Sequence, residues 1–172
     1  GKARMSSTKV QAKEAKKSSK NVALAEKAVM NDPNSAAYRV LLGEAYLDAG
    51  RFQSAATSFG DAMRLGETSP HTALRLALAH VGAGQQNQAL AVLDEWRDQI
   101  EPSDLGLAYS LAGQPSRGVY VLSAALREGD NTPKTRQNLA YAYALAGDWA
   151  NARLMAAQDV PADKVGDRLL EW

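Results

Sequence analysis

The chain has 172 residues, of which 45% are hydrophobic and only 6% aromatic, and its formal net charge is +1. This composition favours closely packed helices over a sheet core, since strands favour aromatic and β-branched side chains. The absence of cysteine excludes disulfides, thiolate metal sites and cysteine nucleophiles. No apolar run approaches the roughly 18 residues of a membrane span, and any export signal would have to precede residue 1.

The N-terminal segment differs in composition from the rest. Residues 1–20 carry seven basic residues against one acidic residue, a net charge of +6, and since the whole chain carries +1, the rest of it carries −5. Because the segment is rich in lysine and serine and poor in apolar side chains, we expect residues 1–13 to be disordered. It is either a solvated linker or a segment attracted to an anionic surface such as a membrane, nucleic acid or cell-wall polymer. Few aromatic residues interleave with the lysines, so sequence-specific nucleic-acid binding is not expected.

A short phrase recurs four times along the rest of the chain. Residues 45–55 (AYLDAGRFQSA) and 142–152 (AYALAGDWANA) are nearly the same, and residues 79–89 and 108–118 are weaker copies. The copies begin 34, 29 and 34 residues apart. A period in this range indicates a repeat architecture.

Each copy predicts a helix, a tight turn at a glycine and a second helix. In the first copy, apolar residues recur at helical spacing before Gly50 and again from Phe52 to Met63. Glycine accepts the left-handed conformation of a helix end, so Gly50, Gly84, Gly113 and Gly147 are the expected turns. The 29-residue step, with a proline at its start, predicts a short helix over 103–112. Neither helix of a unit can bury its apolar face alone, so the units should stack in series.

These positions resemble the tetratricopeptide repeat (TPR), a helix–turn–helix of 34 residues. In the first unit the matching residues are Leu42, Gly43, Tyr46, Gly50, Ala55, Phe59 and Ala62. The second unit departs at Trp96 and the third at Gly118, where the repeat has alanine. The resemblance implies an all-α, right-handed TPR solenoid of antiparallel helix pairs with a C-terminal capping helix. It divides the chain into a partial repeat (14–33), repeats over about 35–68, 70–101, 103–131 and 133–160, and a cap (161–172).

No residue pattern indicates an enzyme. The two histidines, His71 and His80, lie nine residues apart without a metal-binding spacing, and His80 stands where the repeat has tyrosine. The glycines at 82 and 84 are not a nucleotide loop, because no strand precedes them. We therefore predict no catalytic residue, no metal ligand and no cofactor.

The resemblance also implies a binding face. In TPR proteins the first helices of the repeats line a concave groove that holds a peptide. The positions carried over to this chain are Val40, Glu44, Leu47, His71, Leu74, Arg75, Leu78, Leu107, Leu111, Lys134, Asn138 and Tyr141. An apolar stripe with a few polar groups suits an extended or helical peptide, although each leucine could equally belong to the core. The lysine–asparagine carboxylate clamp of chaperone-binding repeats is not expected, since Val40 and Glu44 occupy its first two positions.

A narrower resemblance concerns residues 135–165. This run is similar to the last repeat and cap of bacterial tight-adherence (Flp) pilus assembly TPR proteins of the TadD type. It implies an assembly factor for a pilus or secretion apparatus, located in the bacterial periplasm and associated with the outer membrane through an anchor upstream of residue 1. The alternatives are an envelope TPR module coupled to a peptidoglycan-binding domain, and a cytoplasmic regulator or co-chaperone. The expected partner is a protein or peptide, without nucleic acid, and self-association is compatible with an uncapped end.

Overall fold

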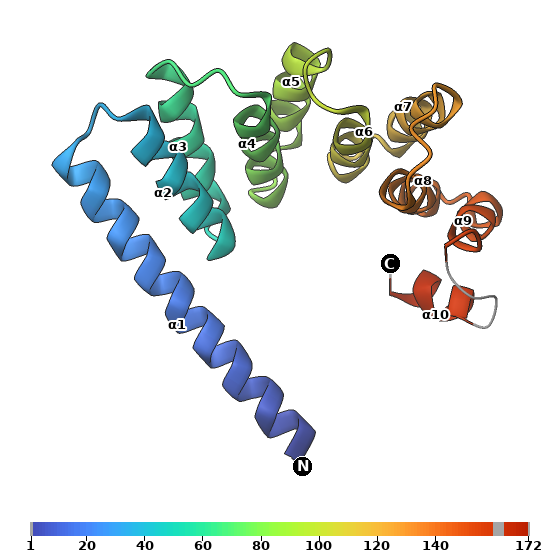
Figure 1. Ribbon diagram of the computed structural model, residues 1–172, viewed down its shortest axis with the longest axis horizontal. Coiled ribbons are helices and arrows are strands. Elements are labelled where there is room, and N and C mark those ends of the chain that lie inside the picture. The colour runs from blue at the N-terminus through green and yellow to red at the C-terminus, as the bar shows by residue number, and fades with distance from the viewer. Residues whose placement is uncertain (1, 160–163, 172) are drawn as a thin grey trace. The chain divides into compact units, whose positions relative to one another are not determined.

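The computed structural model describes residues 2–159 and 164–171, and this part of the chain is built from helices without strands (Figure 1). The chain divides into two compact units, Gly1–Gln85 and Gln86–Trp172. The first unit holds α1 (Lys2–Asn31), α2 (Ala36–Asp48), α3 (Phe52–Arg64) and α4 (Pro70–Gly82). The second holds α5 (Gln86–Trp96), α6 (Pro102–Leu111), α7 (Pro115–Arg127), α8 (Pro133–Leu145), α9 (Trp149–Ala156) and α10 (Val165–Leu170). The boundary between the units falls inside the predicted repeat 70–101.

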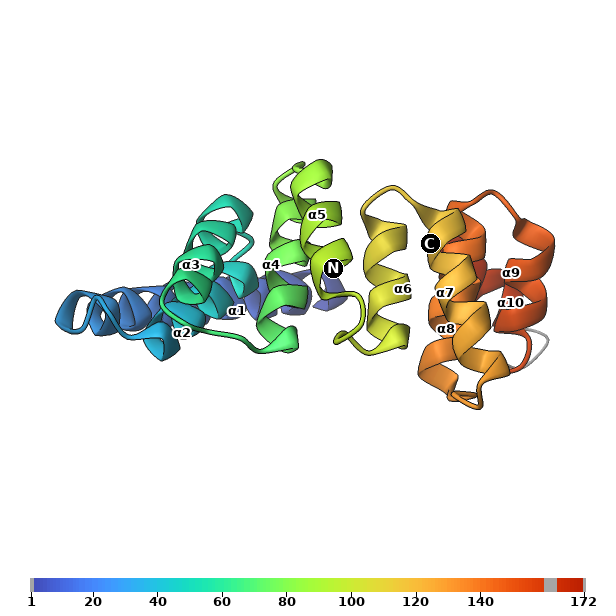
Figure 2. The ribbon, with the colours of Figure 1, turned by 90° about the horizontal axis from the view of Figure 1, so that it is seen from above.

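Consecutive helices pack against each other as pairs, α2 on α3, α6 on α7 and α8 on α9 (Figure 2). In two of the pairs a buried large side chain covers a glycine of the facing helix. The ring of Phe59 lies against Gly43, and the side chain of Leu122 lies against Gly106, so a Cβ at either glycine would collide with it. The close approach of these helices therefore depends on the absence of a side chain at the two glycines.

The predicted glycine turns are confirmed. Gly50, Gly84, Gly113 and Gly147 all have positive φ, between +72° and +88°. At the last of them, the N–H of Gly147 donates to the C=O of Ala144 (3.0 Å), and the next N–H donates to the C=O of Tyr143 (2.8 Å). This pair of bonds is the Schellman motif, which satisfies carbonyls left open at a helix end.

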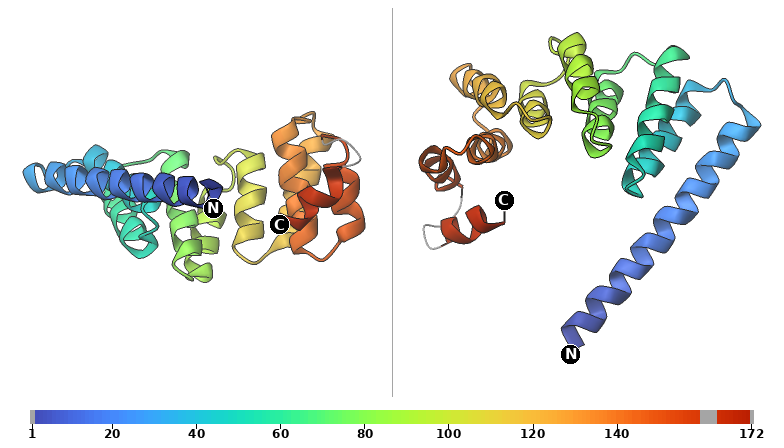
Figure 3. Two further views of the ribbon diagram at one scale, coloured as in Figure 1. Left: turned by 90° about the horizontal axis from the view of Figure 1, so that it is seen from below. Right: turned by 180° about the vertical axis from the view of Figure 1, so that it is seen from behind.

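The predicted disorder of residues 1–13 is not what the structure has, since α1 begins at Lys2. Lysine, alanine and glutamine are good helix formers, and a helix that is already nucleated extends at little cost. Every side chain from Ser6 to Lys17 is exposed, whereas Val22 and Ala25 are buried where α1 packs against α2. The N-terminal half of α1 extends past α2 and α3 (Figures 1 and 3). None of the described helices, long α1 included, is apolar enough to cross a membrane.

In the third repeat, the packing of α6 and α7 explains why Gly118 stands where the pattern has alanine. As predicted, α6 is short, with 10 residues. A Cβ at Gly118 would lie 2.5 Å from the backbone oxygen of Gly106 and would also collide with Ser110 Oγ. That hydroxyl donates to the C=O of Gly106 (2.8 Å). Glycine replaces the alanine of the pattern because α6 and α7 approach too closely for a methyl group.

The predicted capping segment, 161–172, lies partly outside the described residues. Within the described part, α10 packs against α9. Leu169 packs against the small buried residues Ala156 of α9 and Ala140 of α8.

Candidate functional site

The predicted groove residues of the first unit lie on α2 and α4. Val40, Leu47, Leu74 and Leu78 are half-buried, so each is partly accessible. Glu44 of α2 forms an ion pair with Arg75 of α4, so the acidic residue and the arginine predicted on this face are partners of each other. His71 is exposed at the first turn of α4.

In the second unit, the predicted polar groove residues hold α8 against α6. Lys134 Nζ lies 2.8 Å from Asp104 Oδ1, and the hydrogen bond raises the pKa of the lysine. Asn138 Nδ2 donates to the C=O of Ser103 (3.1 Å) and to its hydroxyl (3.3 Å). Leu107 and Leu111 of α6 and Tyr141 of α8 are half-buried. Lys134 and Asn138 thus act between helices in this structure.

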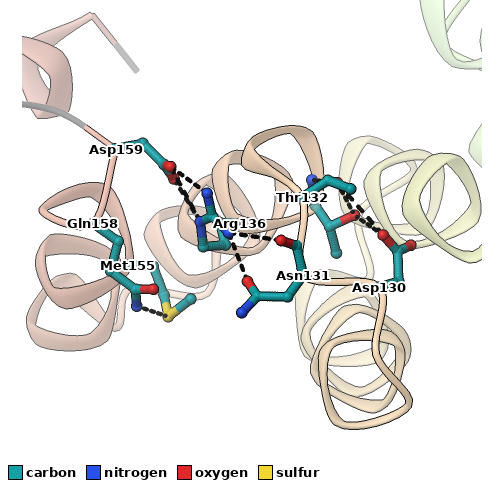
Figure 4. Close-up of polar contacts among 8 residues, drawn as sticks. Asp130, Asn131, Thr132, Arg136, Met155, Gln158 and Asp159 are labelled. Carbon is teal, nitrogen blue, oxygen red and sulfur yellow. Dashed lines mark hydrogen bonds and ion pairs between the residues drawn. The ribbon is translucent and has the colours of Figure 1, made fainter.

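Two arginines that the sequence analysis missed hold the start of a first helix both to the preceding loop and to an aspartate in, or just after, the following second helix. Arg136 of α8 is hydrogen-bonded to both carboxylate oxygens of Asp159 (2.6–3.1 Å) and to Asn131 (Figure 4). The two charged side chains are only 16% and 10% exposed, and the hydrogen bond from Arg136 lowers the pKa of Asp159. Arg39 of α2 likewise contacts Asp61 (3.2 Å) and the C=O at residue 33. Both arginines stand eleven residues before a turn glycine, a regularity that is visible in the sequence.

A polar network also ties α5 to α6 and α7. The buried Tyr109 donates from its hydroxyl to Asp94 Oδ1 (2.7 Å), and the guanidinium of Arg117 lies 4.1 Å from the centre of the tyrosine ring. Burial and the bond to Asp94 raise the pKa of Tyr109 to about 12. Burial works to raise the pKa of Asp94, but hydrogen bonds from Tyr109 and Arg117 lower it overall. Because Tyr109 is buried, the network holds the three helices together and offers no tyrosine hydroxyl to solvent.

His80 contacts the loop that follows α4. His80 is half-buried, and its Nδ1 lies 2.8 Å from Gln85 Oε1. Within residues 2–159 and 164–171, no cluster of three or more histidine, aspartate or glutamate side chains could hold a metal ion.

One concave surface of the first unit lies between α1 and α2. A cavity of about 360 Å³ is lined by Asn21, Leu24, Ala25, Leu41, Glu44, Ala45 and Asp48, which we call the α1/α2 groove. Leu24 and Leu41 are 60% and 48% exposed, so the groove presents apolar surface to solvent. A second cavity of about 510 Å³ begins at Asp48 and continues along the projecting half of α1, past Ala15 and Ser18.

The second unit shows what such a groove can hold. Counted from the turn glycines Gly50 and Gly147, α1 and α2 correspond to α7 and α8. There α6 packs against both helices. Gly106 of α6 contacts Leu122 of α7, and Ser103 of α6 accepts a hydrogen bond from Asn138 of α8. At the equivalent positions of the first unit, Ala25 replaces Leu122 and Leu41 replaces Asn138. The α1/α2 groove is therefore the surface that a first helix occupies in the other unit, here left open by the described residues.

Of the predicted groove residues, only Glu44 lines this cavity. The sequence predicted a second helix within residues 14–33, but no prediction was made of what covers the other side of that helix. The signal was present, because within the described chain the second helix predicted at 14–33 pairs with the helix that follows it, and this pairing leaves one face of α1 and α2 open.

No known family model matches the chain, and no curated protein sequence matches it. Its fold is nevertheless similar to solved structures. TTC0263, a thermophilic TPR protein in Thermus thermophilus, is 23% identical with a TM-score of 0.65, over 94% of this chain and 93% of that one. YrrB, described as a TPR protein with an unusual peptide-binding site, is 17% identical with a TM-score of 0.64, over 91% and 83%. MamA is 19% identical with a TM-score of 0.62, over 88% and 90%. The fold is that of TPR proteins.

Proposed function

We propose that this protein is a non-catalytic scaffold that binds a helix of a partner protein in the α1/α2 groove. The TPR fold supports a role in protein–protein interaction, and the structural neighbour YrrB carries a peptide-binding site. The observation that carries the proposal is the equivalent surface of α7 and α8, which packs a helix, α6.

The groove residues define the chemistry of the partner helix. Ala25 stands where α7 has Leu122, so the facing position takes a large apolar side chain instead of a glycine. Leu41 stands where α8 has Asn138, so the facing position is apolar instead of a serine. Asp48 is exposed and is in no ion pair within the described part of the chain, which favours a basic residue on that flank.

A peptide experiment tests this groove. One probe is residues 101–113 of this chain, with the helix fixed by a staple on its outer face so that folding does not limit binding. A second probe carries Ser103→Leu and Gly106→Leu. Fluorescence anisotropy should show the second peptide binding the full chain about tenfold or more tighter, since two buried leucines add several kcal/mol of apolar contact.

The matched control exchanges the groove chemistry. A chain with Ala25→Leu and Leu41→Asn has the side chains of α7 and α8 and should prefer the unmodified peptide. If neither peptide binds, or if the exchange leaves the preference unchanged, the groove is not a helix site.

The face predicted from the repeat pattern is the alternative place for a partner segment. In each unit taken by itself, half-buried leucines (on α4 in the first, on α6 in the second) offer apolar contacts beside the Glu44–Arg75 and Lys134–Asp104 ion pairs. Leu78→Glu and Leu107→Glu, each checked for folding, should abolish peptide capture if that face binds. They should leave binding to the α1/α2 groove intact, which distinguishes the two locations.

For the biological setting, we propose an assembly factor for a bacterial tight-adherence pilus or secretion apparatus in the periplasm, near the outer membrane. This rests on the resemblance of residues 135–165 alone. Residues 13–172 used as bait in an envelope extract should capture pilus or secretin components. Capture of cell-wall enzymes would favour the peptidoglycan-linked alternative, and binding only in cytoplasmic extract would favour a regulator.

A further inference from the structure

A row of lysines runs along one face of α1. Six exposed lysines of this helix are in no ion pair within the described part of the chain: Lys9, Lys13, Lys16, Lys17, Lys20 and Lys27. Since each residue of a helix turns by about 100°, these six positions fall within an arc of roughly 100°. At about 1.5 Å per residue the row is about 27 Å long.

The opposite side of the helix packs against the protein. Val22 and Ala25 are buried and Ser18 and Val29 are half-buried, and all four lie on the side away from the lysines. Because α2 covers only that side, the lysine row faces solvent over its whole length. The cavity that continues from Asp48 along α1 also lies on the side away from the row.

We propose that the lysine row binds the anionic surface of a lipid bilayer, with α1 lying along the headgroup layer. A straight, one-sided row of cations on a helix matches a flat sheet of negative charge, and several basic residues on one helix face are the pattern that such membranes attract. The attraction is electrostatic and falls with rising salt concentration, because surface charges are screened over about 10 Å.

Duplex nucleic acid fits this helix less well. A helix in the major groove has phosphates on both walls and needs cations on both flanks. In α1 the cations occupy one arc, and Glu14 lies outside it on the flank that leads to the packing face. A flat bilayer leaves that flank away from the charged surface.

Vesicle sedimentation with the full chain tests the proposal. The protein should bind vesicles that contain phosphatidylglycerol, should release them at high salt, and should not bind vesicles of phosphatidylcholine alone. The triple variant Lys13→Gln, Lys16→Gln, Lys20→Gln should lose on the order of 100-fold in partitioning, taking each lysine near the surface as worth about a factor of five. Glutamine is also a good helix former, so helix content by circular dichroism should not change.

The control removes the same charge elsewhere. Arg97, Arg127 and Arg153 are exposed and lie outside α1, and their replacement by glutamine should leave partitioning within a few-fold of the parent. No binding to anionic vesicles, an equal loss in this control, or tighter binding to duplex DNA that depends on the lysine row would each overturn the proposal. Peptide binding to the α1/α2 groove should be unchanged in the lysine variant, so failure here is distinct from failure of the proposed scaffold.

Discussion

The substitution of alanine for glycine should have opposite effects at Gly147 and Gly60. Gly147 has a φ of +80°, and a Cβ there would meet no atom within 4 Å, so the cost of Gly147→Ala is purely that of the left-handed backbone. That cost is about 1–2 kcal/mol, reduced by the lower entropy of the unfolded alanine chain, which leaves a net loss of about 1 kcal/mol. Gly60 lies inside α3 with equally open space around it, so Gly60→Ala should gain about 0.5–1 kcal/mol.

Thermal and urea unfolding followed by far-UV circular dichroism would measure both changes. For a chain of this size, 1 kcal/mol corresponds to a Tm change of about 2–4 °C. The two variants add the same atoms in equally unhindered places, so only the backbone conformation differs between them. A stabilised or unchanged Gly147→Ala protein would refute the assignment of Gly147 to a left-handed turn, and with it the repeat phase.

Three further substitutions test the packing and the polar ties. Gly118→Ala should destabilise the protein by about 1–3 kcal/mol in urea unfolding, because the methyl group collides with the backbone of α6. Asp159→Asn should destabilise at neutral pH; since its pKa is lowered in the folded protein, this contribution is present above the unfolded pKa of about 3.9 and is lost as pH falls through the folded pKa, so the two proteins should converge in acid. Tyr109→Phe should cost about 1 kcal/mol below pH 10 and should remove the phenol that titrates at about 12 in an alkaline absorbance titration. Since the pKa of Tyr109 is raised in the folded protein, this contribution is lost as pH rises through about 12. Equal stability of parent and variant at neutral pH would contradict the bond to Asp94.

The repeat phase could be read from the sequence because it depends on local chemistry. A glycine with positive φ and an apolar stripe at helical spacing leave marks within a dozen residues, as at Gly50 and Gly113. The short α6 followed from the same local signals. The small residues Gly43 and Gly106 also matched the pattern, although only the structure shows that the side chains of Phe59 and Leu122 require them.

The candidate site could not be read in the same way, because it depends on which helices lie side by side. The pattern placed Lys134 and Asn138 in a binding groove, whereas the structure engages both with α6. It did not single out Leu24 and Leu41, whose importance depends on the cavity that α1 and α2 form between them. The extent of α1 was underestimated because composition reports the burial that a segment can achieve, not its ability to continue a helix that is anchored elsewhere.

The two halves of α1 should differ sharply in how fast their amide hydrogens exchange with solvent. The C-terminal half opens only when Val22 and Ala25 leave their contacts with α2, whereas the half from Ser6 to Lys17 has no buried side chain to hold it closed. Helix–coil opening of an exposed helical segment takes about a microsecond or less, so we expect the amide hydrogens of this half to exchange faster. The lysine row exists as a row only while the helix is closed, and any surface that binds it would slow exchange in those turns first.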